Sequence, residues 1–252
     1  MLDLIIVQIS DLHCGSPEMF LRDKLSLAIS EINTLNPDVV IINGDLADNG
    51  LKNEFEEAQR FIDQIECPTK IVTMGNHDAR HTGFLIFEEL FGKPSGVFNG
   101  RDYTIFYANT ARADKDEGRI SRDQLELITK AFTESSDKLK ILVMHHHLIP
   151  VPDTGLEQAI VEDAGDVLKI VSGLGVDLVL SGHRHRPWMW NLNGIDFVCS
   201  GAVSTRRLRG FFENSYNIIE IKEDKIVPKL KIVGGPLLDF KQIVSSTQPI
   251  LP

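Results

Sequence analysis

The chain has 252 residues with 36 acidic and 26 basic side chains, and its formal net charge of −10 argues against nucleic acid as a partner. Its 42% of hydrophobic residues can fill a large core, and its three widely spaced cysteines exclude a disulfide framework. No leader-like segment opens the chain and no apolar run is long enough to span a membrane, so we expect a cytoplasmic protein without membrane attachment.

The first part of the chain alternates buried strands with amphipathic helices. Leu4–Ile9 is an almost continuous apolar run, typical of a strand buried on both faces, and a helical pattern follows over Met19–Leu35. We expect further strands at Asp38–Ile42 and Lys70–Met74, with the helix Glu54–Ile65 between them. This order predicts a largely parallel sheet.

The remaining elements continue this pattern and then change to short strands. Helices are expected at Phe84–Leu90, Ser121–Phe132 and Leu156–Leu174, and strands at Tyr103–Tyr107, Leu139–Met144 and Asp177–Leu180. Short strands follow at Trp188–Leu192, Ile195–Val198, Tyr216–Ile221 and Ile226–Val233. We therefore expect a mostly antiparallel sheet in the last third, a single domain over residues 1–233, and a tail at 234–252 to which we assign no regular structure.

Polar side chains gather directly after five of the predicted strands. The segments are 11–13 (DLH), 44–48 (GDLAD), 75–78 (GNHD), 145–147 (HHH) and 182–185 (GHRH). Ligands of open α/β sheets bind at this edge, beyond the carboxyl ends of the strands. Five such clusters in succession are hard to produce by chance, so the sequence predicts a metal site.

The types of candidate ligand narrow the choice of metal. Imidazole, carboxylate and amide oxygen without thiolate suit Mn, Fe or Zn, whereas a structural zinc site would use close cysteine pairs. The number of candidate ligands exceeds the four that one tetrahedral ion needs. Two ions about 3.5–4 Å apart, bridged by a carboxylate, account for all of the candidates.

The five segments resemble the calcineurin-like metallophosphoesterase superfamily. Its pattern is D-x-H, G-D-x-x-D, G-N-H-[DE], a later His after a strand, and G-H-x-H, and all of these occur in order over residues 11–185. The resemblance implies an α/β fold, a four-layer α/β/β/α sandwich of two mixed sheets flanked by helices, with a dinuclear centre at the strand ends.

The resemblance also implies a set of ligands. They are Asp11, His13 and His185 for the first ion, Asp45 for both ions, and Asn76, His183 and one histidine of 145–147 for the second. The position directly after the strand favours His145. His147 stays open because the proline that often follows in the family is delayed here to Pro150.

His77 and Asp48 are the catalytic residues that the resemblance implies. Attack of a metal-bound hydroxide on phosphorus would be completed by His77, which protonates the departing alkoxide, while Asp48 orients its imidazole. Alternatively, Asp48 is an acidic residue that stabilises the N-terminus of the helix that follows it. The two roles of Asp48 are compatible. Asn76, His77 and His146 are the candidates for contact with substrate.

The details of the pattern favour one branch of this superfamily. Protein phosphatases continue the second segment with Arg-Gly, but Asn49-Gly50 stands here, so that arginine clamp for phosphate is missing. The HHH run and residues 118–121 (GRIS) resemble bacterial class III cyclic-nucleotide phosphodiesterases and glycerophosphodiester hydrolases. The sequence thus predicts hydrolysis of a small phosphodiester. The alternatives are a broad phosphomonoesterase, a nuclease, or a scaffold of the same fold without catalysis.

Residues outside the five segments are weaker candidates. Arg184 and Arg186 are candidates for binding phosphate, with a solvated surface as the alternative, and Arg80 and His81 are candidates for contact with substrate. The basic segment 206–209 is interpreted as a solvated loop, and the neighbouring Phe211-Phe212 pair as cover for the site or for a homodimer interface.

Overall fold

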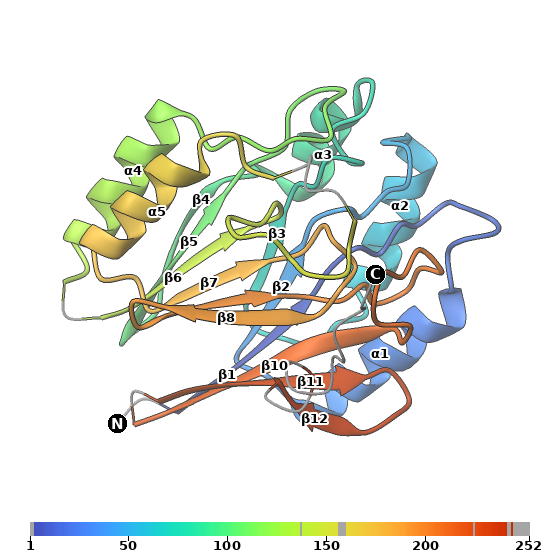
Figure 1. Cartoon of the computed structure of the whole chain (residues 1–252). Coiled ribbons are helices and arrows are strands. Elements are labelled where there is room, and N and C mark those ends of the chain that lie inside the picture. The colour runs from blue at the N-terminus through green and yellow to red at the C-terminus, as the bar shows by residue number, and fades with distance from the viewer. Residues whose placement is uncertain (1–2, 137, 156–159, 224, 241–242, 244–252) are drawn as a thin grey trace.

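The computed structural model describes residues 3–136, 138–155, 160–223, 225–240 and 243. Two six-stranded mixed sheets pack face to face, and helices cover the outer face of each sheet (Figure 1). The expected four-layer α/β/β/α sandwich is therefore confirmed. None of the described helices is long and apolar enough to cross a membrane.

The first sheet has the strand order β12-β11-β10-β1-β2-β3. Its parallel half consists of β1 (Asp3–Ile9), β2 (Val39–Asn43) and β3 (Lys70–Thr73), and its antiparallel half of β10 (Ser215–Lys222), β11 (Lys225–Ile232) and β12 (Leu237–Asp239). The helices on its outer face are α1 (Arg22–Leu35), α2 (Lys52–Ile62) and α3 (Gly83–Phe91). The parallel order expected for the first three strands is confirmed.

The second sheet has the order β4-β5-β6-β7-β9-β8. Four parallel strands, β5 (Tyr103–Ala108), β6 (Leu139–Met144), β7 (Leu178–Ser181) and β9 (Ile195–Cys199), lie between the antiparallel edge strands β4 (Gly96–Asn99) and β8 (Trp188–Leu192). The helices α4 (Arg122–Thr133) and α5 (Ala164–Gly173) cover its outer face. Each sheet thus presents several parallel carboxyl ends.

The continuous apolar runs of the central strands follow from burial on both faces. In β1, Val7 and Ile9 pack in the core with the first three helices, whereas Leu4 and Ile6 pack in the core between the two sheets. Ile6 and Val7 are fully buried, and complete burial of such a side chain stabilises the fold by roughly 1.5–3 kcal/mol. A polar residue here needs buried hydrogen-bond partners, as Gln8 has in the carbonyl oxygen of Ser181 and the amide of Asn217, so apolar residues fill most positions on both faces.

The structure corrects four expectations about the elements. The helix expected from Met19 begins at Arg22. The helix expected over Leu156–Leu174 begins at Ala164, because residues 160–163 form a bend, a bridge and a turn. Residues 156–159 of that expected helix lie outside the described residues. Strand β4 was not expected. In the tail, β12 pairs with β11 and Phe240 is buried, so the expectation of no regular structure is wrong there.

The expectation of one antiparallel sheet in the last third is also wrong. The hairpin β8–β9 joins the second sheet, where β9 runs parallel to β7, and the hairpin β10–β11 joins the first sheet beside β1. A hairpin is specified by its local turn, but the sheet edge that it joins depends on residues far away in sequence.

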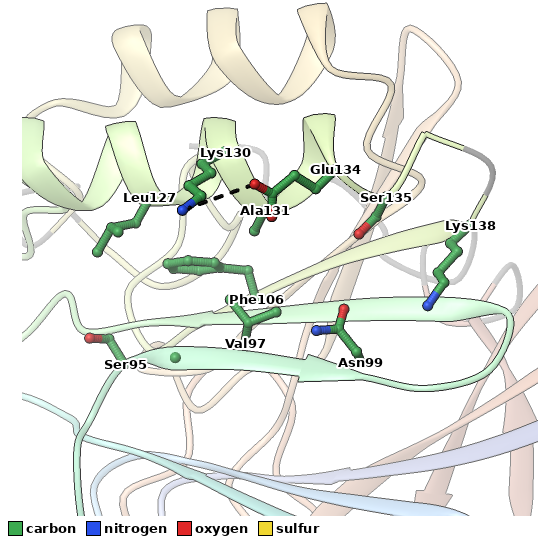
Figure 2. Close-up of a pocket in the computed structure, with 11 residues that line it drawn as sticks. Ser95, Val97, Asn99, Phe106, Leu127, Lys130, Ala131, Glu134, Ser135 and Lys138 are labelled. Carbon is green, nitrogen blue, oxygen red and sulfur yellow. Dashed lines mark ion pairs between the residues drawn. The ribbon is translucent and has the colours of Figure 1, made fainter.

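A pocket of about 530 Å³ lies between α4 and the β4 edge of the second sheet (Figure 2). Val97, Phe106 and Leu127 form its apolar part, and Lys130 forms an ion pair with Glu134 beside them. Of the described residues that line this pocket, none is an aspartate or a histidine. The pocket is therefore separate from the polar strand ends.

Candidate metal centre and active site

The carboxyl ends of strands from both sheets converge on the candidate ligands. Residues after β1, β2 and β3 in the first sheet meet residues after β6 and β7 in the second. Main-chain hydrogen bonds tie neighbouring loops together, for example from Asp11 N to Gly44 O at 3.1 Å and from Gly182 N to His145 O at 2.9 Å. The five polar segments of the sequence therefore form one site.

Several candidate ligands adopt an uncommon backbone conformation. The φ angles are positive at Asp11 (57°), His13 (50°), Asp45 (52°), His183 (71°) and His185 (54°). Non-glycine residues rarely adopt this region, and a strained residue of this kind costs of order 1–3 kcal/mol. The surrounding structure supports this strain, which aims the side chains at one another.

Two glycines of the pattern are required by close approach. A Cβ atom at Gly75 would lie 2.1 Å from Asp45 Oδ1, and one at Gly44 would lie 2.5 Å from His145 Nδ1. Gly44 also has a φ of +82°, which disfavours a side chain. These segments begin with glycine because the functional side chains occupy the adjacent space.

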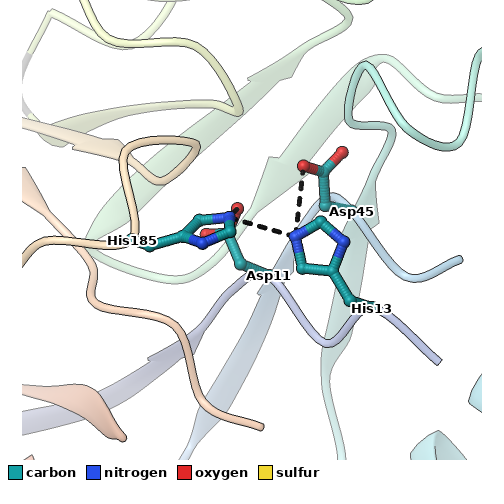
Figure 3. Close-up of side chains that lie close together, drawn as sticks. All are labelled: Asp11, His13, Asp45 and His185. Atoms are coloured by element: carbon teal, nitrogen blue, oxygen red, sulfur yellow. Dashed lines mark hydrogen bonds and ion pairs between the residues drawn. The ribbon is translucent and has the colours of Figure 1, made fainter. Parts of the chain in front are cut away.

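The first cluster contains Asp11, His13, Asp45 and His185 (Figure 3). His13 Nε2 lies 3.0 Å from His185 Nε2, and His185 Nε2 lies 3.2 Å from Asp11 Oδ1. His13 Nδ1 donates to the carboxylate of Asp48 at 3.1 Å, and His185 Nδ1 donates to the carbonyl oxygen of Arg207. With both imidazoles neutral, two nitrogen lone pairs therefore face each other, an arrangement that a shared cation stabilises.

The second cluster contains Asp45, His145 and His183, with Asn76 beside it. Asn76 Oδ1 lies 3.2 Å from His145 Nε2 and 3.0 Å from His183 Nδ1, and Asp45 Oδ2 lies 3.4 Å from His145 Nε2. His145 Nδ1 donates to the carbonyl oxygen of Asn43 at 2.8 Å, which directs Nε2 at these oxygens. His145 rather than His147 belongs to this cluster.

The electrostatics of the site favour a bound positive charge. Burial would raise the pKa of Asp45, but His145 and His77 outweigh it and hold the pKa well below its usual range. Burial would lower the pKa of His145, but Asp45 raises it to about 9. For His13 burial prevails and lowers the pKa to about 4. The donor set therefore fits divalent cations, and nitrogen and oxygen donors are the types that Mn, Fe and Zn accept.

Asp48 contacts its expected partner His77 through its main chain, whereas its carboxylate has a partner that was not predicted. The imidazole of His77 donates from Nδ1 to the main-chain oxygen of Asp48 at 2.7 Å, whereas the Asp48 carboxylate oxygen Oδ1 is 3.8 Å away. The carboxylate instead accepts from His13. Asp48 therefore orients a candidate ligand with its side chain and the candidate catalytic imidazole with its backbone.

Arg207 and Asp116 contact the site without having been predicted to do so. The guanidinium group of Arg207 binds both carboxylate oxygens of Asp48, so this part of the 206–209 segment is not a solvated loop. Asp116 accepts a 3.1 Å hydrogen bond from Asn76 Nδ2, which directs Asn76 Oδ1 at the histidines. Neither residue lies in a recognisable motif, and the only indication of Arg207 in the sequence was its place in a basic segment.

Three other candidates are positioned as structural residues. His146 is buried, its Nδ1 contacts Thr110 Oγ1 at 2.8 Å and its Nε2 contacts the main-chain oxygen of Asp116 at 3.1 Å, so the expectation that it contacts substrate does not fit. Arg184 is buried and donates a hydrogen bond to the main-chain oxygen of Thr154, and Arg186 is buried and donates to the carboxylate of Asp153. Neither arginine is a solvated side chain or directed at the candidate ligands.

A two-sheet sandwich with Asp, Asn and His side chains at its strand ends defines a class of metal-dependent hydrolases of phosphoric esters. The family model for calcineurin-like phosphoesterase matches residues 4–187, so the chain belongs to that family. This membership confirms the resemblance found in the sequence and the expectation of a metal-dependent phosphoric ester hydrolase.

Similar proteins include two curated relatives and a solved structure. The chain is 29% identical over 186 residues to a probable cyclic nucleotide phosphodiesterase of Xenorhabdus bovienii, covering 71% of this chain and 73% of the relative. It is 27% identical over 208 residues to a probable glycerophosphodiester phosphodiesterase of Arcobacter nitrofigilis, covering 75% of each. A dimetal phosphatase from Danio rerio has the same fold, with a TM-score of 0.71, 13% identity, and coverage of 94% of this chain and 99% of that one.

Proposed function

We propose that this protein is a dinuclear metal-dependent phosphodiesterase that hydrolyses small phosphodiesters of the cyclic nucleotide or glycerophosphodiester type. The observation that carries the proposal is the inward convergence of acceptor atoms from both sheets, including the facing Nε2 atoms of His13 and His185, 3.0 Å apart. Acceptor atoms that face one another in this way suit cations bound among them.

The two clusters suggest an assignment of the ligands. We assign Asp11, His13 and His185 to one ion and Asn76, His145 and His183 to the other, with Asp45 shared because it belongs to both clusters. Two cations would supply Lewis-acid stabilisation of phosphoryl charge and a lowered pKa for water. The proposal leaves open whether Mn, Fe or Zn is bound.

His77 is the residue to which we assign proton transfer to the departing oxygen. Its main-chain N–H donates to Asp45 Oδ1 at 2.9 Å and its Nδ1 donates to Asp48 O at 2.7 Å, which fixes the ring and presents Nε2. The side chain of His77 is 16% exposed, whereas that of His13 is fully buried. A substrate can therefore contact the side chain of His77, whereas it cannot contact a fully buried ligand such as His13.

The preference for a diester rests on the relatives and on one departure from the protein phosphatases. The two curated relatives described above bear the names of phosphodiesterases. The side chain of Asn49, at the position of the missing arginine, hydrogen-bonds to Glu54 Oε1 at 3.2 Å and supplies no charge to phosphate. We therefore place the substrate among small diesters.

The test is hydrolysis of bis(p-nitrophenyl) phosphate beside p-nitrophenyl phosphate by chelated protein reloaded with Mn²⁺. We expect faster turnover of the diester. A preference for the monoester would refute the diester assignment, and failure to hydrolyse either compound with two ions bound would refute the enzyme proposal.

The role of His77 is tested separately with His77→Ala. Removal of a general acid costs typically about 10²–10⁴-fold in rate, and we expect this loss in kcat with an unchanged metal content. Unchanged turnover would remove His77 from the mechanism. Loss of metal would show that its role is to hold the centre together.

A further inference from the structure

Partly exposed side chains lie around the candidate catalytic residue His77. Asp11, His13 and His145 are fully buried. The side chains of His77, Arg80 and Asp116, which contact one another or the candidate ligands, are 16%, 32% and 71% exposed. A phosphate ester that reaches His77 Nε2 therefore meets Arg80, whose Nη2 lies 3.2 Å from that atom.

The guanidinium group of Arg80 lies beside His77. Arg80 Nη1 donates to the main-chain oxygen of Asp48 at 3.1 Å, and Arg80 Nη2 donates to His77 Nε2 at 3.2 Å. Asp116 Oδ1 is 3.8 Å from Arg80 Nη2, beyond hydrogen-bond distance. The two hydrogen bonds that described residues accept leave further donors of the guanidinium, which has five N–H groups.

We propose that Arg80 is a substrate-binding residue that donates to a phosphoryl oxygen of the ester and takes the place of the arginine missing at position 49. This inference rests on the proposed function, since it concerns the same site.

The contact with His77 is the main argument. A leaving-group oxygen that takes its proton from His77 Nε2 must lie where Arg80 Nη2 now lies, and the protonated Nε2 that this transfer requires cannot also accept from Arg80. The freed guanidinium group then lies beside the same phosphoryl group, where an anion is its natural partner. Arg80 therefore exchanges an imidazole nitrogen for a charged oxygen acceptor when substrate binds.

Arg207 does not serve this purpose although it is also close. Both of its terminal nitrogens bind the Asp48 carboxylate, so its charge is already compensated. Arg80 is instead paired with the exposed carboxylate of Asp116 at 3.8 Å, too far for a hydrogen bond. Its charge is therefore less fully compensated than that of Arg207.

The experiment compares metal-loaded wild type with Arg80→Ala, Arg80→Gln and Arg80→Lys. Isothermal titration with inorganic phosphate gives Kd, bis(p-nitrophenyl) phosphate gives kcat and KM, and elemental analysis gives metal content. A charge-assisted hydrogen bond contributes roughly 1.5–3 kcal/mol, so we expect Kd for phosphate and KM to rise about 10- to 100-fold in the Ala and Gln variants. The Lys variant should fall between, because it keeps the charge but loses the planar fork.

Arg112→Ala is the matched control. Arg112 is 30% exposed and pairs with Glu162 at 2.8 Å, so we expect unchanged phosphate affinity there. If Arg80→Ala and Arg80→Gln keep the wild-type Kd for phosphate and lose only kcat, Arg80 merely holds His77 and Asp48, and the inference is wrong. Absence of hydrolysis by the wild type refutes the proposed function instead, and phosphate titration still decides whether Arg80 binds the anion.

Discussion

Replacing Arg207 by alanine should weaken both the fold and the metal centre. Arg207 contacts both oxygens of the Asp48 carboxylate, and the Asp48 and Arg207 side chains are 6% and 35% exposed. Hydrogen bonds to a charged group contribute roughly 1.5–3 kcal/mol, and we take about 2 kcal/mol because Arg207 is partly solvated. For a chain of this size that loss lowers the melting temperature by roughly 4–8 °C.

The same change should reduce metal affinity through His13. Asp48 fixes the tautomer and the orientation of His13, and Arg207 fixes Asp48. Loss of a partner that orients a ligand costs typically about 10- to 100-fold in metal affinity. Competition with a fluorescent chelator measures this affinity, and thermal unfolding of chelated protein measures the effect on stability alone.

The pH dependence of the stability difference follows from Asp48. Burial raises the pKa of Asp48, but hydrogen bonds from His13 and Arg207 outweigh burial and lower it to about 2. A lowered pKa stabilises the fold above the unfolded value of about 3.9, and this stabilisation is lost as the pH falls through the folded value. The difference between wild type and Arg207→Ala should thus be complete at neutral pH and shrink below pH 4.

Arg206→Ala is the control for this prediction, because Arg206 is an exposed neighbour in the same segment. If Arg207→Ala matches Arg206→Ala in melting temperature and in metal affinity, the ion pair with Asp48 has no role in holding the centre.

Two further predictions concern the metal ions. Asp116→Ala should lower the affinity of the metal site to which we assign Asn76 roughly 10-fold, because Asn76 loses the acceptor that directs its amide oxygen. Elemental analysis after dialysis measures this loss, and an unchanged stoichiometry would contradict it. Complete removal of metal by a chelator should lower the melting temperature of the wild type, because ions that bind only the folded state stabilise it by mass action. Reloading with metal should restore the melting temperature. Equal melting temperatures of metal-free and metal-loaded protein would argue against a metal centre in the native fold.

The sequence alone predicted most of the strands and the clusters of candidate ligands, because both are local features. A strand buried on two faces needs a nearly continuous apolar run, and the runs at β1, β2, β6 and β7 are short and are followed by polar segments. Glycines such as Gly75 stand in these segments because nearby side chains leave no room for a Cβ. Patterns of this kind can be recognised without knowing where distant residues lie.

Only the tertiary structure decided which atoms act on which. Arg207 lies 159 positions from Asp48, and Asp116 lies 40 positions from Asn76, so their contacts exist only once both sheets are packed. The choice of His145 over its two neighbours likewise depends on which ring of three adjacent histidines reaches Asp45 and Asn76. The local sequence shows which types of residue form the site. The role of each residue depends on its distance from residues in other segments, and a local sequence pattern gives no information on these distances.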